Sequence, residues 1–184
     1  AVHGAGHATQ LDALDAARTL SGDIAYLDPP YNQHSYLGNY HIWETLVRWD
    51  APEAYGVARK RIDVRTRPSI FNSRPRHADA MRALIDTLDA RVLVVSFSDE
   101  GYLTREELTT MLASRGEVMV LEHDFKRYVG AQIGIHNPAG TKVGAITHLR
   151  NTEYLFVAGR AHDLDAVRRA AQLHIASGAI AAAR

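Results

Sequence analysis

The chain has 184 residues, 46% of them hydrophobic and 23% charged, which is the composition of an ordinary globular protein with one core. Its formal net charge is zero, so any surface that attracts nucleic acid must be local. The absence of cysteine excludes disulfide bonds, thiolate metal sites and a cysteine nucleophile. No apolar run approaches the roughly 20 residues of a membrane span, and no secretory signal is recognisable, so we expect a cytoplasmic protein.

The first elements predicted are the end of a strand at residues 8–10 and a helix that starts near Leu11 and ends before Gly22. Apolar residues recur in this helix at Leu14, Ala17 and Leu20. Asp12 stands where a side chain would cap the first turn of the helix.

The next element is a short apolar run at residues 24–27 that ends at an acid and two prolines. A run without alternation is typical of a parallel strand buried on both faces. Pro29 biases Asp28 toward an extended backbone, and both Pro29 and Pro30 lack an N–H group and have a fixed φ. Ligands bind at the carboxyl ends of strands in open α/β sheets, so we expect a binding site at Asp28 and the adjacent Tyr31.

Residues 32–40 predict a loop, and residues 41–49 predict an amphipathic helix. His41 and Glu44 lie three apart, but the sequence suggests no third ligand, so no metal site is predicted.

Residues 57–77 carry seven basic side chains against the single acid Asp63, a local net charge of +6. The segment shows no strong helical or strand period, which predicts a loop. Arginine suits phosphate because its planar fork donates two parallel hydrogen bonds. A solvated charged loop is the alternative interpretation.

Helix and strand signals alternate through the rest of the chain. We predict a helix at 77–88, a buried strand at 91–97, a polar turn at 98–101, and a helix that begins with a Thr104–Glu107 capping box and ends at Gly116. A third strand at 117–122 precedes a basic-aromatic cluster at 125–128 and a long loop at 130–144. A fourth strand at 151–157 is expected to pair with the third, and a helix at 163–183 follows. This alternation predicts a three-layer α/β sheet of four or five strands.

Asp28-Pro29-Pro30-Tyr31 at the end of a buried strand resembles the motif of the Dam-like (alpha-group) adenine-specific DNA methyltransferases, where it lies in the C-terminal half. The resemblance covers roughly residues 7–158. The segments that extend it are 39–46, 71–73, 92–96, 125–128 and 151–157. It implies a Rossmann-like class I methyltransferase fold with an antiparallel hairpin at one edge. It also implies S-adenosylmethionine as cofactor and double-stranded DNA as partner.

The resemblance assigns catalysis to Asp28, Pro29, Pro30 and Tyr31. Asp28 and the carbonyl that follows it would accept hydrogen bonds from the exocyclic amine of a flipped adenine, on which Tyr31 would stack. Asp12 and Asp28 would contact the cofactor, and for Asp12 this role can coexist with helix capping. The ring carbon of cytosine is excluded as the target, because its methylation resembles chemistry that needs a cysteine nucleophile.

The basic segments are then expected to face DNA. The predicted DNA contacts are Arg59, Lys60, Arg61, Arg65, Arg67, Asn72, Ser73, Arg74, Lys126, Arg127 and Tyr128. A companion restriction endonuclease is a further expected partner.

The chain departs from the family pattern because the glycine-rich cofactor loop and the target-recognition region, which normally lie upstream, are absent. We expect residues 1–160 to be the C-terminal part of the catalytic domain and residues 161–184 a C-terminal helix. The missing N-terminal portion would be a partner. Without it, the strand at 24–27 would have an unpaired apolar edge, and the chain alone would bind the cofactor poorly and transfer no methyl group.

Two alternatives stay open. One is a methyltransferase for another amine, that of cytosine, an RNA base or a protein glutamine, although the acid Asp28 favours adenine. The other is a non-catalytic nucleic-acid-binding or assembly subunit.

Overall fold

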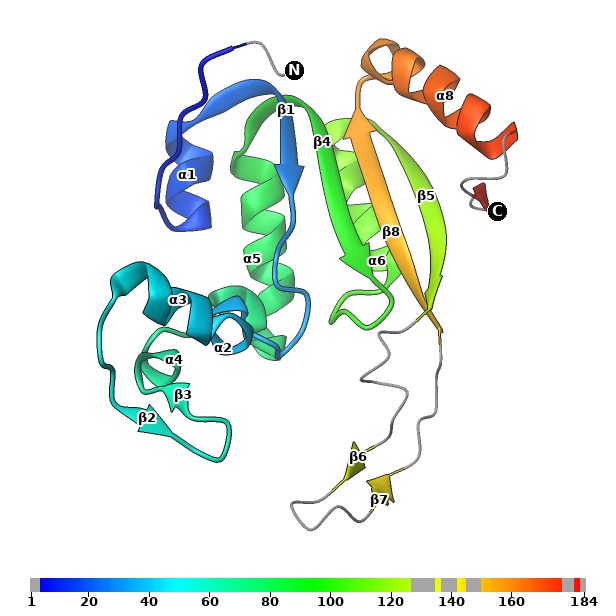
Figure 1. Ribbon diagram of the computed structural model, residues 1–184. Helices are drawn as coiled ribbons and strands as arrows, with labels where there is room; N and C mark the ends of the chain where they lie inside the picture. The colour runs from blue at the N-terminus through cyan, green and yellow to red at the C-terminus, as the bar shows by residue number, and fades with distance from the viewer. Residues whose placement is uncertain (1–3, 127–134, 137–141, 145–149, 177–180, 183–184) are drawn as a thin grey trace.

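A mixed five-stranded sheet, in the order β1-β4-β8-β5-β9, forms the centre of the protein (Figure 1). The computed structural model describes residues 4–126, 135–136, 142–144, 150–176 and 181–182. The strands are β1 (Ser21–Leu27), β4 (Asp89–Ser98), β5 (Glu117–Lys126), β8 (Arg150–Gly159) and β9 (Ala181–Ala182). Strands β1 and β4 are parallel, and β8 is antiparallel to both of its neighbours. This is a mixed α/β fold, as predicted.

Helices lie on both faces of the sheet. On one face, α1 (Ala13–Thr19), α5 (Arg74–Thr87) and α6 (Arg105–Leu112) pack on the inward residues of β4, such as Leu93 and Val95. On the other face, α8 (Ala161–Ala176) contributes Leu164 to a smaller cluster with Val92 and Val157. The larger core therefore lies between the sheet and α1, α5 and α6.

The predicted cap of α1 is confirmed, because Asp12 Oδ1 accepts a hydrogen bond of 2.9 Å from the backbone N–H of Leu14. The strand predicted at residues 8–10 is wrong. These residues are exposed and join no sheet, so the chain reaches α1 without pairing.

Strand β1 is longer than predicted and is buried on one face only. Ala25 and Leu27 pack against the larger core, but Ile24 and Tyr26 are 67% and 61% exposed. The register places Ile24 beside Val92, on the face that α8 covers further along the sheet. The prediction of burial on both faces is therefore wrong here, whereas the expected apolar edge is confirmed, since β1 is an outer strand of the described sheet.

Residues 36–72 form a set of short elements that lie below α1 and near the lower end of α5 in Figure 1. They are α2 (Tyr36–Asn39), α3 (His41–Arg48), β2 (Ala54–Tyr55), β3 (Lys60–Arg61), α4 (Asp63–Thr66) and the 3-10 helix η1 (Ile70–Asn72). The loops predicted at 32–40 and 57–77 are therefore wrong in detail. Elements of two to four residues are too short to show a period in the sequence.

The remaining elements largely match the prediction. The capping box of α6 is confirmed, with hydrogen bonds in both directions between Thr104 and Glu107. The hairpin is also confirmed, because β5 and β8 pair antiparallel from Glu117 opposite Gly159 to Lys126 opposite Arg150. A short antiparallel pair, β6 (Ile135–His136) and β7 (Lys142–Gly144), lies between them in the chain.

The C-terminal helix is shorter than predicted. Helix α8 ends at Ala176, and Ala181–Ala182 form β9, which pairs with Leu121 and Glu122 of β5. The outer edge of β5 offers free backbone groups there, and pairing with them overrides the helix propensity of alanine. Every helix in the described part of the chain is too short or too polar to cross a lipid bilayer.

Candidate active site

The turn from Asp28 to Tyr31 leaves the sheet at the carboxyl end of β1, beside the carboxyl end of the parallel strand β4. Asp28 is exposed, and its carboxylate forms no ion pair with any described residue. Pro29 is buried and Pro30 half-buried, so the prolines anchor the turn while the acid faces solvent. The Tyr36 hydroxyl lies 3.5 Å from the backbone carbonyl oxygen of Asp28.

Tyr31 is half-buried and packs on the end of β4. Its ring centroid lies 5.6 Å from that of the buried Phe97, and its carbonyl accepts a hydrogen bond of 2.8 Å from the backbone N–H of Tyr102. Burial raises the pKa of the Tyr31 hydroxyl, and the nearby carboxylates of Glu153 and Asp28 raise it further. The contacts of Tyr31 with Phe97 and with the Tyr102 N–H hold it in place close to Asp28.

Glu153 lies at the same edge of the sheet, opposite Ser98 in the β4–β8 ladder. Burial raises the pKa of its carboxyl, and the charges of Asp99 and Asp28 raise it further. Sequence reasoning did not select Glu153. The available signal was that Glu153 lies in the segment 151–157, which was predicted to be a strand and which extends the family resemblance.

Asn72, predicted to contact DNA, lies instead against the segment that follows the turn. Its Nδ2 donates hydrogen bonds to the carbonyl oxygens of Asn32 at 2.7 Å and His34 at 3.3 Å. Ser73, its neighbour, is half-buried and directly precedes α5.

Several of the predicted basic contacts are exposed. The Arg65 guanidinium lies 4.0 Å from the centre of the Tyr55 ring, and that of Arg74 lies 5.9 Å from the Tyr102 ring. Arg67 is exposed, with its guanidinium 3.7 Å from a carboxylate oxygen of Glu44. The exposed Arg59 ends the turn that joins β2 to β3 and adopts a left-handed backbone with φ of 50°, and the half-buried Lys60 begins β3.

Arg61 differs from these residues because its side chain is 3% exposed. Its guanidinium donates to both carboxylate oxygens of Asp50 at 2.6 and 2.8 Å, to Asp63 at 3.1 Å and to the Thr45 hydroxyl at 3.1 Å. Hydrogen bonds from Arg61 lower the pKa of Asp50 and of Asp63. Arg61 is therefore placed as a structural cation, and a phosphate cannot reach it without displacing these acids.

The second basic cluster is described only in part. Arg127 and Tyr128 lie outside the described residues, and for Lys126 the structure gives only its backbone pairing with Arg150 at the end of β5.

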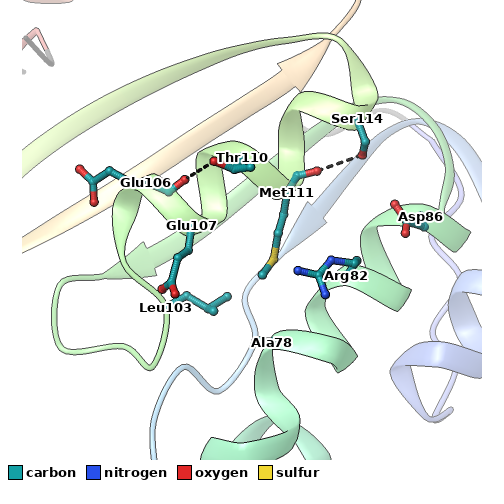
Figure 2. A pocket seen from close by; sticks show the side chains of 9 residues that line it. All are labelled: Ala78, Arg82, Asp86, Leu103, Glu106, Glu107, Thr110, Met111 and Ser114. Atoms are coloured by element: carbon teal, nitrogen blue, oxygen red, sulfur yellow. Dashed lines mark hydrogen bonds between the residues drawn. The ribbon is translucent and has the colours of Figure 1, made fainter.

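The groove between α5 and α6 is a separate feature of about 530 Å³ (Figure 2). Arg82 of α5 and Met111 of α6 point toward each other across it, and the Thr110 and Ser114 hydroxyls bond to carbonyls of their own helical segment. Its lining contains no residue of the Asp28 turn, so the groove is not the active-site cleft. Within the described residues, no group of three His, Asp or Glu side chains is placed to hold a metal ion.

Comparisons with known proteins relate the sequence to methyltransferases. M.FokI of Planomicrobium okeanokoites, a type II methyltransferase, is 38% identical over 105 residues, which are 57% of this chain and 16% of M.FokI. The modification methylases StsI of Streptococcus sanguinis and LlaI of Lactococcus lactis subsp. lactis are 32% and 31% identical, over 55% and 60% of this chain. The chain thus spans less than a fifth of the length of these three relatives. No solved structure matches it. The family model for the D12 class N6 adenine-specific DNA methyltransferases matches residues 3–111, more than half of the sequence and including the Asp28 turn, and the chain therefore belongs to that family.

Proposed function

We propose that this chain carries the catalytic turn of an enzyme that transfers a methyl group from S-adenosylmethionine to the exocyclic N6 amine of adenine in DNA. The observation that supports the proposal most is the exposed Asp28 carboxylate, which forms no ion pair with a described residue and lies beside the buried Pro29 at the carboxyl end of β1, within the family match. Methyl transfer to another amine is the runner-up, and the product of the reaction distinguishes the two.

The chemical role of the turn follows from the weakness of the nucleophile. The lone pair of the adenine amine is delocalised into the ring. The Asp28 carboxylate would accept one hydrogen of the amine and the Asp28 carbonyl the other, which localises the lone pair on nitrogen. A hydrogen bond to a charged group contributes about 1.5–3 kcal/mol, or roughly 10- to 150-fold in rate if it forms fully only in the transition state.

S-adenosylmethionine supplies the electrophilic methyl group when it is bound. Asp12 and Asp28 fit such a cofactor because both side chains are exposed, and their carboxylates can accept hydrogen bonds from its amino groups and hydroxyls. The Leu14 N–H bonds Asp12 Oδ1, so the other carboxylate oxygen of Asp12 remains for that contact.

A base within a duplex cannot reach Asp28, so the target adenine would be flipped out of the helix. Tyr31 would stack on it, since its ring is already fixed on Phe97. Six of the predicted basic and polar residues, supported by their exposure or half-burial, would hold the flanking phosphates. They are Arg59, Lys60, Arg65, Arg67, Ser73 and Arg74, and Lys126, Arg127 and Tyr128 remain proposed on the sequence alone.

The arrangement β1-β4-β8-β5 supports a Rossmann-like class I methyltransferase sheet. We propose that the open edge of β1 pairs with a further strand, and that the glycine-rich cofactor loop lies on that strand. A companion restriction endonuclease is proposed on the likeness to the modification methylases alone.

The proposal is tested by methyl transfer from labelled S-adenosylmethionine to duplex DNA, with the whole protein that carries these residues. We expect Asp28→Ala to lower the rate at least about tenfold, because it removes the hydrogen bond of the carboxylate and leaves that of the backbone carbonyl. The control Asp79→Asn changes an exposed acid of α5 and should leave the rate unchanged. Salt-sensitive DNA binding without any transfer by the unchanged protein would instead support a non-catalytic subunit.

A further inference from the structure

The segment that follows the catalytic turn is held by side-chain and backbone donors from two remote elements. Asn72 Nδ2 bonds the Asn32 carbonyl at 2.7 Å and the His34 carbonyl at 3.3 Å. The Tyr102 N–H bonds the Tyr31 carbonyl at 2.8 Å. Three carbonyls within four residues of the chain are therefore fixed by groups 40 and about 70 positions away in the sequence.

Asn72 is itself rigidly mounted. It ends η1, whose first turn is capped by Ser69 and whose Phe71 is buried. The Tyr102 hydroxyl donates to the Asn72 carbonyl oxygen at 3.3 Å, and the buried His77 ring bonds the Phe71 carbonyl through Nδ1 at 2.7 Å. Because Tyr102 and His77 hold the backbone at Asn72 and Phe71, the Asn72 amide can define the position of the segment that it binds.

The amide of Asn72 has no group left for DNA in this arrangement. A side-chain amide has two donor hydrogens, and both point to carbonyls of the segment after the turn. Its Oδ1 is buried from solvent and has no hydrogen-bond partner among the described residues. A phosphate or base edge could therefore bind Asn72 only after these contacts break.

We propose that Asn72 is a positioning residue that fixes the segment after the catalytic turn, and through it Asp28 and Tyr31, rather than a DNA contact. The inference rests on the proposed function for its catalytic consequence, but its structural part is independent of that function. Only an amide serves here, because the site requires two donors on one short side chain.

The test compares Asn72→Leu, which keeps the size of the side chain without its donors or any new charge, with Asn72→Gln, which keeps both donors. In methyl transfer, Asn72→Leu should lower kcat at least about tenfold, because two hydrogen bonds that orient the turn are lost. KM for DNA and the salt dependence of DNA binding should stay within about twofold. Asn72→Gln should restore part of kcat, and Asp79→Asn is the matched control.

Amide hydrogen exchange of residues 31–36 gives a second measurement that needs no activity. In the chain alone, Asn72→Leu should speed this exchange about tenfold, while Asp79→Asn leaves it unchanged. A raised KM with unchanged kcat would overturn the inference in favour of a DNA contact. Unchanged exchange at residues 31–36 would overturn it as well, because it would show that Asn72 does not hold this segment. If the unchanged protein transfers no methyl group, the proposed function fails, and the exchange result still decides the role of Asn72.

Discussion

At the residue scale, the buried guanidinium of Arg61 organises the region between the Asp28 turn and α5. It links Asp50, Asp63 and Thr45, which come from three separate short elements or connections. Removing one partner from a buried ion cluster leaves the remaining charges without compensation. We predict that Arg61→Ala lowers the thermal midpoint by more than about 4 °C. The exposed Arg59→Ala should lower it by less than about 2 °C, and equal shifts for the two variants would contradict the assignment.

The same cluster predicts a pH dependence. Arg61 lowers the pKa of Asp50 and Asp63 in the folded state below the value of about 3.9 that they have in the unfolded chain. Their contribution to stability is therefore complete above about pH 5 and is lost as the pH falls through 3.9 toward the lowered values. The difference in stability between the unchanged protein and Arg61→Ala should shrink in that acid range, as denaturant titrations at several pH values would show.

His77 predicts a second loss of stability as the pH falls, which begins at a higher pH than the first. Burial lowers its pKa below the ordinary 6.5, and its ring lies between Tyr102 and Phe97. The folded state thus favours the neutral ring, so stability is complete above pH 6.5 and falls as the pH drops toward the lowered pKa. An NMR titration should show that the pKa of His77 lies below 6.5, and a pKa at or above 6.5 would contradict this environment.

At the scale of elements, α3 turns its polar face toward the protein. Thr45 accepts from the buried Arg61, and Arg48 pairs with Glu44 and Asp63. The apolar side chains of α3, and that of Trp49 directly after it, are exposed instead. Their exposed fractions are 63% for Ile42, 64% for Trp43, 50% for Leu46, 85% for Val47 and 85% for Trp49. The sequence predicted the amphipathic pattern, but a pattern alone does not say which face is inward.

This orientation can be measured through the two tryptophans of the chain, Trp43 and Trp49. Both are more than half exposed, so we predict red-shifted emission that acrylamide quenches readily. A blue-shifted, protected emission would show that the apolar face of α3 is covered in solution.

Elements with their own local signals were predictable. The capping box fixes the start of α6, and the long apolar runs of β4 and β8 predict strands. Residues 57–77 were not predictable, because their structure depends on ion pairs and hydrogen bonds to distant residues. The local positive charge around Arg61 and the polar side chain of Asn72 suggested DNA contacts. In the structure, Arg61 instead donates hydrogen bonds to Asp50, and Asn72 donates one to the Asn32 carbonyl.

At the scale of the whole molecule, the sheet is covered unevenly. The larger core fills one face, while Ile24 and Tyr26 leave an apolar strip on the other face at the outer strand β1. Exposed apolar edge strands pair with other chains. We predict concentration-dependent self-association of the chain that Ile24→Lys reduces, as light scattering would show, with Val57→Lys as a matched exposed control. Association unaffected by Ile24→Lys would exclude β1 as the contact.

The position of the Asp28 turn at the carboxyl end of a strand could be predicted, because a strand, an acid and two prolines are adjacent in the sequence. Its surroundings could not, because the sheet register and long-range contacts bring Glu153, Tyr102 and Asn72 to this turn and to the segment that follows it. The prediction that both faces of β1 are buried was also wrong for one face, since an apolar sequence does not reveal whether a helix packs on each face of the strand.

The central claim is that the Asp28 turn directs a methyl group to the N6 amine of adenine. Mass spectrometry of nucleosides from duplex DNA, after incubation with the whole protein and S-adenosylmethionine, tests it most directly. The account predicts N6-methyladenine with the unchanged protein and at least about tenfold less of it, in the same incubation time, with Asp28→Ala. Methylated cytosine as the only product, or an undiminished yield of N6-methyladenine from Asp28→Ala, would contradict it.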